Sequence, residues 1–241
     1  MAVTIRAFVR EVGERLDGQS DPGVQDWWDR YLKGAAVFRG VRMADVRKTV
    51  RAMVVEHGLA DAPAARMLQL AHGCMRERPT EDKLAGVLLL AEHALDRIDL
   101  SHVPDLAKPF EWGDLADWNV VDWTGVKLLG PFVSAGSDVK ERAHAIAAWR
   151  DADGLWQRRA AAVAFVNHAA EEHELFRGFH SLLIEVCEAN VRDEARWSQT
   201  SVGWLLRDLS RHGPGRRRVE RFLAAHPELS AEARKNATKY L

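Results

Sequence analysis

The sequence contains little cysteine. Only Cys74 and Cys187 occur among its 241 residues, and neither belongs to a CxxC motif. This excludes a framework of several disulfides and a cysteine-based zinc site, and it is typical of proteins of the reducing cytoplasm. The chain is nevertheless long enough to bury a substantial hydrophobic core without such cross-links.

Long apolar runs are also lacking. Even the run GVLLLA at 86–91 is much shorter than a bilayer span and has charged residues on both sides. The first sixteen residues, MAVTIRAFVREVGERL, place arginines and acids among the apolar positions, so we expect an amphipathic helix and not a signal peptide. These features predict a cytoplasmic protein with no membrane partner.

An excess of charge of either sign is missing. The 34 lysines and arginines are balanced by 35 aspartates and glutamates, which gives a net charge of −1. A nucleic-acid partner would therefore have to meet a local basic face, since the total charge neither supports nor excludes one.

Alternating runs of β-branched residues are scarce, whereas helical periodicity is present along most of the chain. The segment 43–58 repeats its apolar residues on one helical face, at Val46, Val50, Met53 and Val54. The sequence therefore predicts an all-α fold.

Helix starts are expected at three polar residues, since each precedes an apolar-periodic segment as a helix N-cap does: Thr80, Ser137 and Ser230. Glycine and proline fall between the helical segments, and no low-complexity tract or long linker occurs. We therefore predict a single domain, 1–241.

A similarity between two segments of the chain indicates the architecture. KLAGVLLLAEH at 83–93 is similar to RRAAAVAFVNH at 158–168, and the two segments begin 75 residues apart. This spacing is about two periods of a helical-hairpin repeat of the HEAT class, which stacks into a solenoid with a concave surface. An irregular helical bundle is the alternative, and periodicity alone does not separate the two.

Tryptophan is concentrated in one part of the chain. Five of the nine tryptophans lie between residues 112 and 156. On a helix, Trp118 and Asp122 are one turn apart and share a face. Taken alone, this pattern is typical of a tryptophan-rich core with an aspartate that caps a helix.

Two further motifs combine an aromatic residue with a charged one, which here is an arginine. Trp156 precedes Arg159 by three residues in LWQRRAAAVAF, and Trp204 precedes Arg207 by three in SVGWLLRDLSRHGPG. Arginines near a helix start are opposed by the helix dipole, which favours an acidic partner or a phosphate beside them. Four more arginines open the next helical segment: Arg216, Arg217, Arg218 and Arg221. Such pairs and clusters are typical of a nucleic-acid groove, although charge runs are more often solvated faces.

Four motifs of the sequence, in this order, resemble those of the AlkD family of bacterial DNA alkylation-repair glycosylases. They are WNVVD (118–122), WQRRAA (156–161), GWLLRDLS (203–210) and LSAEARKNATKYL (229–241). The segment 30–48 also resembles the family's tyrosine-containing entry segment, with its short F-x-G loop at 38–40. The resemblance covers most of the chain.

The resemblance implies a stack of HEAT-like repeats with a concave face that binds duplex DNA. It implies an enzyme of base excision repair that cleaves the N-glycosidic bond of N3- or N7-alkylated purines without flipping the base. By motif position, Asp122 is the catalytic carboxylate and Trp118 and Trp204 are aromatic walls beside the lesion. Arg159 and Arg207 then face phosphates. Tyr31 is a further member of the cleft.

The chemistry of such an enzyme fits a single acid. Cleavage passes through an oxocarbenium-like state, which a nearby carboxylate stabilises. An N3- or N7-alkylated purine already carries positive charge, so it departs without a general acid. Tryptophan faces favour positive charge through their quadrupoles. We therefore expect no metal and no cofactor, and a monomer that associates with the nucleoid when it binds DNA.

The sequence departs from the family pattern in two places. Asn119 stands where the family usually has aspartate, and residues 34–36 are Gly-Ala-Ala where bulkier or charged residues are common. The first change affects a local hydrogen bond, and the second bears on the role of Tyr31 and on lesion preference. Methylated purines and bulky adenine adducts both stay open as substrates.

Other kinds of site find no support. The histidines of HAAEEH at 168–173 are five residues apart, about 140° around a helix, so they do not converge on one metal ion. No nucleotide-binding glycine motif and no serine or cysteine with a paired base occurs. Two non-enzymatic alternatives stay open: a DNA-binding HEAT protein without turnover, and a solenoid that binds other proteins.

Overall fold

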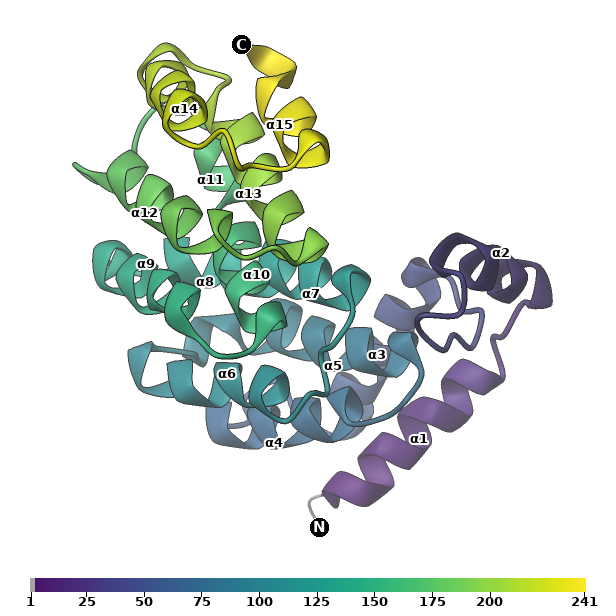
Figure 1. The fold of residues 1–241 in the computed structure, drawn as a ribbon. Helices are drawn as coiled ribbons and strands as arrows, with labels where there is room; N and C mark the ends of the chain where they lie inside the picture. Colours follow the sequence, from purple (N-terminus) through teal and green to yellow (C-terminus); the bar gives the residue numbers. More distant parts are fainter. Residues whose placement is uncertain (1–2) are drawn as a thin grey trace. The chain divides into compact units, whose positions relative to one another are not determined.

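A computed structural model describes residues 3–241, and in that part of the chain it contains helices and no strand (Figure 1). The prediction of an all-α fold is confirmed. One strand-like feature occurs in this described part, an isolated bridge between Val37 and Pro79. No helix in the described residues is long and apolar enough to cross a bilayer.

The chain forms two compact units, one that reaches to Trp123 and one that begins at Thr124. The first contains α1 to α6 and most of α7: α1 Ile5–Asp17, α2 Pro22–Leu32, α3 Met43–Glu56, α4 Ala64–Met75, α5 Thr80–His93, α6 Val103–Glu111 and α7 Trp118–Thr124, with short 3-10 turns at Leu95–Arg97 and Leu100–His102. The division leaves the prediction of a single domain untested.

Helix α5 is the centre of the first unit. Its residues from Leu84 to Leu90 are all buried, because nearly every position in this run is apolar or small. Helices α1, α3 and α4 pack against it, and α4 also packs against α1 and α6. The predicted apolar face of 43–58 is confirmed, since Val46, Val50, Met53 and Val54 are all buried in α3.

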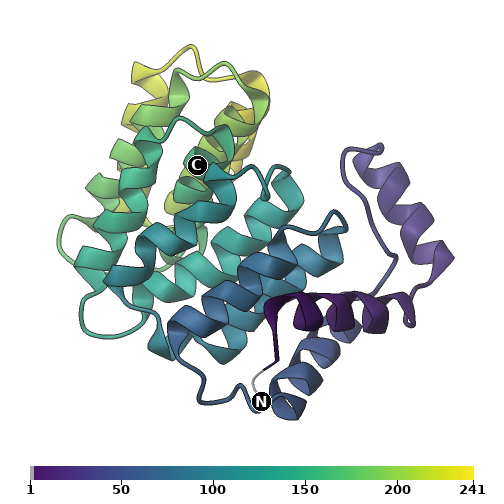
Figure 2. The ribbon, with the colours of Figure 1, turned by 90° about the horizontal axis from the view of Figure 1, so that it is seen from below.

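Helix α2 differs from its neighbours. No close helix pair among residues 3–241 includes it, and both views of the ribbon show it standing apart from α4 and α5 (Figures 1 and 2). Leu32 is its only buried residue. Helix α2 is thus attached to its unit mainly through its ends and the loop that follows it.

The second unit comprises the remaining helices: α8 Gly130–Ser134, α9 Val139–Ala147, α10 Leu155–Val163, α11 Val166–Ala169, α12 Phe179–Val191, α13 Arg196–Leu209, α14 Gly213–Ala225 and α15 Ala231–Ala237, with a π-turn at Gly125–Leu129 and 3-10 turns at Ala148–Asp151 and Thr238–Tyr240. Helix α13 is its centre and packs against α10, α11, α12, α14 and α15. Of the two similar segments, 158–168 is divided between α10 and α11, whereas 83–93 lies in the continuous helix α5.

One of the three predicted helix caps is confirmed. Ser230 precedes α15, and its side chain accepts a hydrogen bond from the backbone N–H of Ala233. The other two predictions are wrong. Helix α9 is preceded by Asp138 and not Ser137, and the Asp138 carboxylate accepts a bond from Arg142 Nε at 2.7 Å instead of capping the backbone.

Thr80 is the first residue of α5 and not its cap, because the cap position is occupied by Pro79. The backbone N–H of Thr80 donates to the carbonyl of Val37 at 2.8 Å, which joins the helix start to the distant loop after α2. This tertiary bond explains why the local N-cap signal failed.

Close packing between α13 and α15 generates a first prediction. A Cβ added at Gly203 would lie 2.5 Å from the carbonyl oxygen of Ala233, which belongs to the backbone. We expect Gly203→Ala to lower the free energy of unfolding by about 1–3 kcal/mol through overpacking. Urea denaturation followed by circular dichroism measures it.

The matched control is Gly18→Ala, at the end of α1. Gly18 has φ −66°, and its added Cβ would meet the Arg15 carbonyl at an ordinary 3.6 Å. We expect this change to leave stability equal or to raise it, because alanine reduces the freedom of the unfolded chain. Equal effects of the two substitutions would contradict the packing argument.

Candidate active site

The helix that carries Trp118 and Asp122 is capped by a different aspartate. The backbone N–H of Val120 donates to Asp117 Oδ1 at 3.0 Å, immediately before α7. Burial raises the pKa of Asp117, although the N–H groups of Val120 and Asn119 act to lower it. The capping role considered for an aspartate in this motif is therefore filled by Asp117, and Asp122 lies inside the helix.

Two faces of α7 have different environments. Val120 and Val121 are fully buried and anchor the helix in the core. Trp118 and Asp122, one turn apart, are both half-buried. Asn119, the departure from the family motif, is only 5% exposed. The helix thus holds Asp122 on a rigid element and leaves it partly accessible beside an indole ring.

Lys83 on α5 fixes the loop that leads into α7. Its ammonium group donates to the carbonyl oxygens of Met75 and Asp114. Burial lowers the pKa of Lys83, while Asp114 and Asp117 act to raise it. The group is engaged with backbone carbonyls at the end of α4 and in the loop, and we assign it a structural role.

The structure brings Tyr31 next to Trp118, and the role of Tyr31 in a cleft stays a prediction. Its ring is 55% exposed on α2, and its centroid lies 5.9 Å from that of Trp118 in an edge-to-face arrangement. Trp27 stacks on Tyr31 with centroids 5.0 Å apart and planes only 14° apart. Trp28 instead stacks on Phe38 at 5.0 Å. Neither tryptophan of α2 was predicted as a site residue, although their spacing from Tyr31 by three and four residues is a helical signal.

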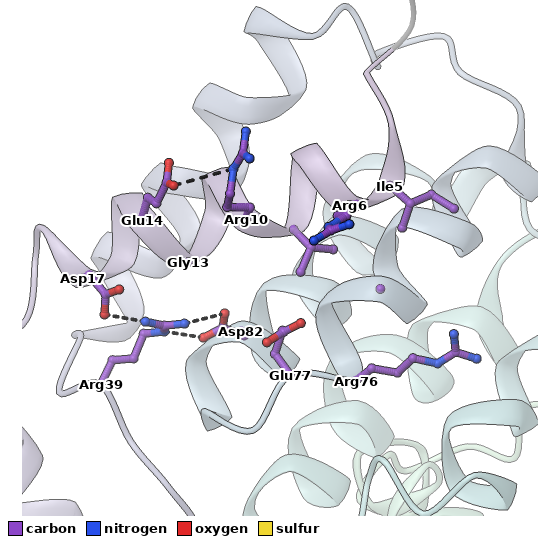
Figure 3. Close-up of a pocket in the computed structure, with 12 residues that line it drawn as sticks. Ile5, Arg6, Arg10, Gly13, Glu14, Asp17, Arg39, Arg76, Glu77 and Asp82 are labelled. Carbon is purple, nitrogen blue, oxygen red and sulfur yellow. Dashed lines mark hydrogen bonds and ion pairs between the residues drawn. The ribbon is translucent and has the colours of Figure 1, made fainter.

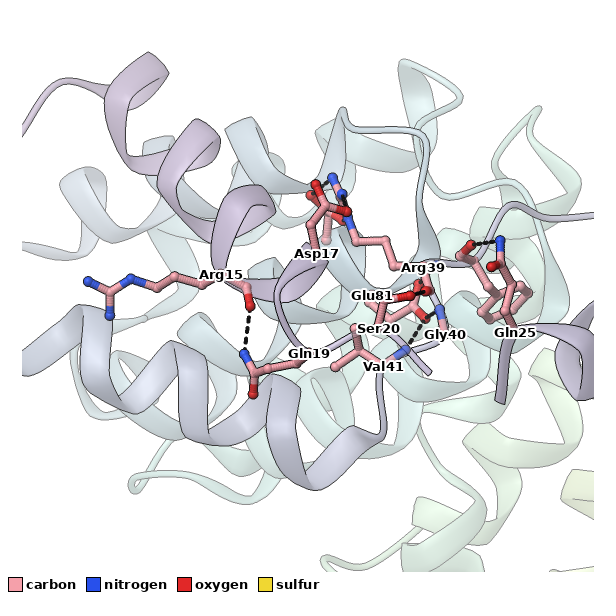
Figure 4. A network of polar contacts seen from close by, with 11 residues as sticks. Arg15, Asp17, Gln19, Ser20, Gln25, Arg39, Gly40, Val41 and Glu81 are labelled. Carbon is pink, nitrogen blue, oxygen red and sulfur yellow. Dashed lines mark hydrogen bonds and ion pairs between the residues drawn. The ribbon is translucent and has the colours of Figure 1, made fainter. Parts of the chain in front are cut away.

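The loop after α2 is held by one buried carboxylate (Figure 4). Glu81, 2% exposed at the start of α5, accepts hydrogen bonds from the backbone N–H groups of Arg39, Gly40 and Val41 at 2.9, 2.9 and 3.0 Å. The Arg39 side chain donates to Asp82 and Asp17, and its hydrogen bond with Asp82 raises the pKa of the guanidinium. The F-x-G loop is therefore part of the scaffold.

Helix α2 is attached to this loop in turn. The backbone N–H of Asp21 donates to the Gly40 carbonyl at 2.9 Å, and Gln25 Nε2 donates to the Phe38 carbonyl at 2.9 Å. Gly40 has φ +83°, and a Cβ there would lie 2.5 Å from the Asp21 carbonyl oxygen. Only glycine fits this position, which sets where α2 begins.

The cavity nearest to this loop does not involve the predicted site residues. A pocket of about 740 Å³ lies between α1 and the α4–α5 connection, and arginines and acids from both sides line it (Figure 3). Neither Asp122 nor any other predicted site residue of the first unit is among its lining residues. We assign it no role in the candidate site.

In the second unit, Arg159 is buried near the start of α10. It is 4% exposed, and its Nη1 donates to the Trp197 carbonyl at 2.7 Å and to Thr200 Oγ1 at 3.1 Å. These bonds join α10 to α13. Arg158, the residue before Arg159, forms an ion pair with Asp193 at 2.6 Å. Of the two partners predicted for an arginine near a helix start, Arg158 therefore has the acidic one. The phosphate contact of Arg159 stays a prediction.

Trp204 and Arg207 share one face of α13, as their spacing predicts. The Arg207 guanidinium carbon lies 5.6 Å from the Trp204 ring centroid, and its Nη2 donates to Asp208 Oδ2 at 2.7 Å. The Trp204 Nε1 atom is buried and has no hydrogen-bond partner among the described residues. Asp208 also accepts a bond from Arg211, which makes this carboxylate a local counter-charge for two arginines.

The histidines of HAAEEH do not form a metal site. His168 Nε2 donates to the Gly130 carbonyl at 2.9 Å, and α11 ends at Ala169, before His173. Within residues 3–241, no group of three histidine, cysteine, aspartate or glutamate side chains is arranged to hold a metal ion.

Comparison with known proteins identifies the family. The family model described as DNA alkylation repair enzyme matches residues 12–241. The chain belongs to this family. The family resemblance inferred from the four sequence motifs is thereby confirmed.

A solved structure described as a predicted DNA alkylation repair enzyme from Enterococcus faecalis has a similar fold, with a TM-score of 0.76 and 21% identity. The similarity covers 92% of this chain and 97% of that chain. At this identity it shows the fold alone. No curated protein matches the sequence.

The cap of α7 generates a second prediction. We expect Asp117→Ala to lower the free energy of unfolding by about 0.5–2 kcal/mol, because the Val120 N–H loses its acceptor at the helix start. Asp117→Asn keeps a capping oxygen and should stay close to wild type. Chemical denaturation of both variants measures the difference. Equal losses of stability would contradict the capping role.

Proposed function

We propose that this member of the DNA alkylation repair enzyme family is a DNA glycosylase for cationic N3- and N7-alkylated purines in duplex DNA. The observation that carries the proposal is the position of Asp122 on α7. It is half-buried one turn from Trp118, in a helix that another acid already caps. The residue that caps α7 is thus Asp117, and Asp122 lies on the same helix one turn from an aromatic residue.

The proposed chemistry needs only this carboxylate. As the N-glycosidic bond breaks, the electron pair leaves with the base, and positive charge develops on the sugar. The ionised Asp122 carboxylate stabilises that charge, and water completes the hydrolysis at the anomeric carbon. The alkylated base is already cationic, so it leaves as a neutral molecule without a proton from the protein.

The aromatic residues have a complementary task. Trp118 and Tyr31, in edge-to-face contact at 5.9 Å, offer ring faces that favour a cationic sugar and base. Partial burial also lowers the local dielectric, which strengthens the attraction between Asp122 and the developing cation. The proposal includes no base flipping, because a charged lesion reached from the groove needs no separate pocket.

The second unit is proposed to contribute Trp204 as a further aromatic contact, and Arg159 and Arg207 as contacts to phosphates. The pairing of Arg207 with Asp208 keeps the guanidinium oriented next to the Trp204 ring. A HEAT-like solenoid with a concave DNA-binding face and a monomeric state belong to the same proposal.

Base release tests the proposal. We expect wild-type protein to release 7-methylguanine or 3-methyladenine from methylated duplex DNA, and Asp122→Asn to lower the single-turnover rate by about a hundredfold or more, because the neutral amide does not stabilise the sugar cation. Chromatography of the free bases measures the rate.

The matched control is Asp117→Asn, an identical change on the same helix that keeps a cap oxygen. It should keep a rate within a few-fold of wild type. An equal loss in both variants would contradict the assignment of Asp122. Salt-dependent binding of duplex DNA without release of any simple or bulky lesion would overturn the enzyme and favour a non-catalytic DNA-binding protein.

A further inference from the structure

We propose that Trp27, on the exposed face of α2, contacts the nucleotides that flank the lesion and so extends the aromatic surface beyond Asp122 along the DNA. The inference rests on the proposed function and adds a residue that the sequence motifs do not include. Its basis is the exposed, stacked pair formed by Trp27 and Tyr31, here called the aromatic pair.

Both rings of the aromatic pair lie on the surface and not in the core. Trp27 is 51% exposed and Tyr31 is 55% exposed. Large apolar side chains that gather on a surface usually mark an interaction site. Trp28, on the same helix, shows the contrasting case, because its ring stacks on the buried Phe38 and anchors α2 to the loop. The two adjacent tryptophans therefore have different tasks.

The aromatic pair is continuous with the candidate catalytic helix. Tyr31 contacts Trp118 at 5.9 Å and Trp27 at 5.0 Å, so the three rings form a row that starts at α7. Trp27 is thus the ring beyond Tyr31 in this row. Successive nucleotides of one strand rise by about 3.4 Å, and the 5.0 Å from Tyr31 to Trp27 is longer than one such rise, so Trp27 is placed to face a nucleotide beyond the one beside Tyr31.

The charged residue of α2 that lies nearest to Trp27 around the helix is basic, and the acidic Asp26 lies about 100° away. Arg30 follows Trp27 by three residues, about 60° around the helix, and Lys33 ends α2. Asp29 lies on the far side of the helix from Trp27, about 160° away. A ring face beside one basic side chain matches a deoxyribose or base edge next to a phosphate. It does not match an acyl chain or a purely apolar peptide.

The aromatic pair is also held in place before any ligand binds. Glu81 fixes the backbone of 39–41, and this loop binds both Asp21 and Gln25 of α2 (Figure 4). Such preorganisation reduces the entropy lost when a side chain contacts its partner. The helix that carries Trp27 is thus fixed to its loop, and the Trp27 ring lies against Trp28 at 4.7 Å and Tyr31 at 5.0 Å while half of it stays exposed.

The test compares Trp27→Ala with Trp112→Ala. Trp112 is a similarly exposed tryptophan of the first unit, at 45%, and packs under Arg76. We expect Trp27→Ala to weaken binding of methylated duplex DNA about five- to tenfold and to raise KM by the same factor. The single-turnover rate at saturating protein should change less than twofold. Trp27→Phe should recover most of the binding, and Trp112→Ala should match wild type.

Different results overturn different claims. Equal binding by wild type and Trp27→Ala, with normal base release, overturns the role of Trp27 and leaves the proposed function intact. A large fall in the single-turnover rate at saturation overturns it as well, because that places Trp27 at the lesion. If wild type releases no base, the proposed function fails, and binding of undamaged duplex by the three variants still decides whether Trp27 contacts DNA.

Discussion

The first unit depends on one buried anion, the Glu81 carboxylate. Three consecutive N–H groups converge on it, and the second acid of the same helical turn, Asp82, binds Arg39 of the same loop. A carboxylate in the first turn of a helix is also stabilised by the helix dipole. Helix α5 therefore uses its N-terminal end to organise a loop some forty residues earlier in the chain, and through that loop it places α2. The aromatic row of the candidate site is built on this arrangement.

Charged groups in this protein thus divide into two kinds. Glu81, Asp82 and Lys83 follow one another at the start of α5, and each is engaged in holding backbone or a partner side chain. Asp122 occupies a helix whose cap and core contacts are supplied by other residues. Three charged residues of α5 thus have an identified structural role, and the cap of α7 is supplied by Asp117 and not by Asp122.

The sequence predicted features that depend on local or periodic signals. The apolar face of α3 and the Ser230 cap were read correctly, because each needs only residues within a few positions. Thr80 was misread because its N–H is used by Val37, a partner that no local pattern reveals. The neighbourhood of Tyr31 and Trp118 came from motif order in a known family, since residues so far apart carry no mutual signal. Trp27 was missed because spacing gives the face of a helix but not its exposure.

Because Asp117 caps α7, the cap of this helix and the charge proposed for catalysis belong to two different aspartates. Had Asp122 capped α7, any change that removed its charge would have weakened the helix as well. With Asp117 in that position, the hydrogen bond at the start of the helix does not depend on Asp122. A change at Asp122 therefore leaves this cap in place. The start of α7 and the acid proposed for catalysis are thus able to change separately in evolution.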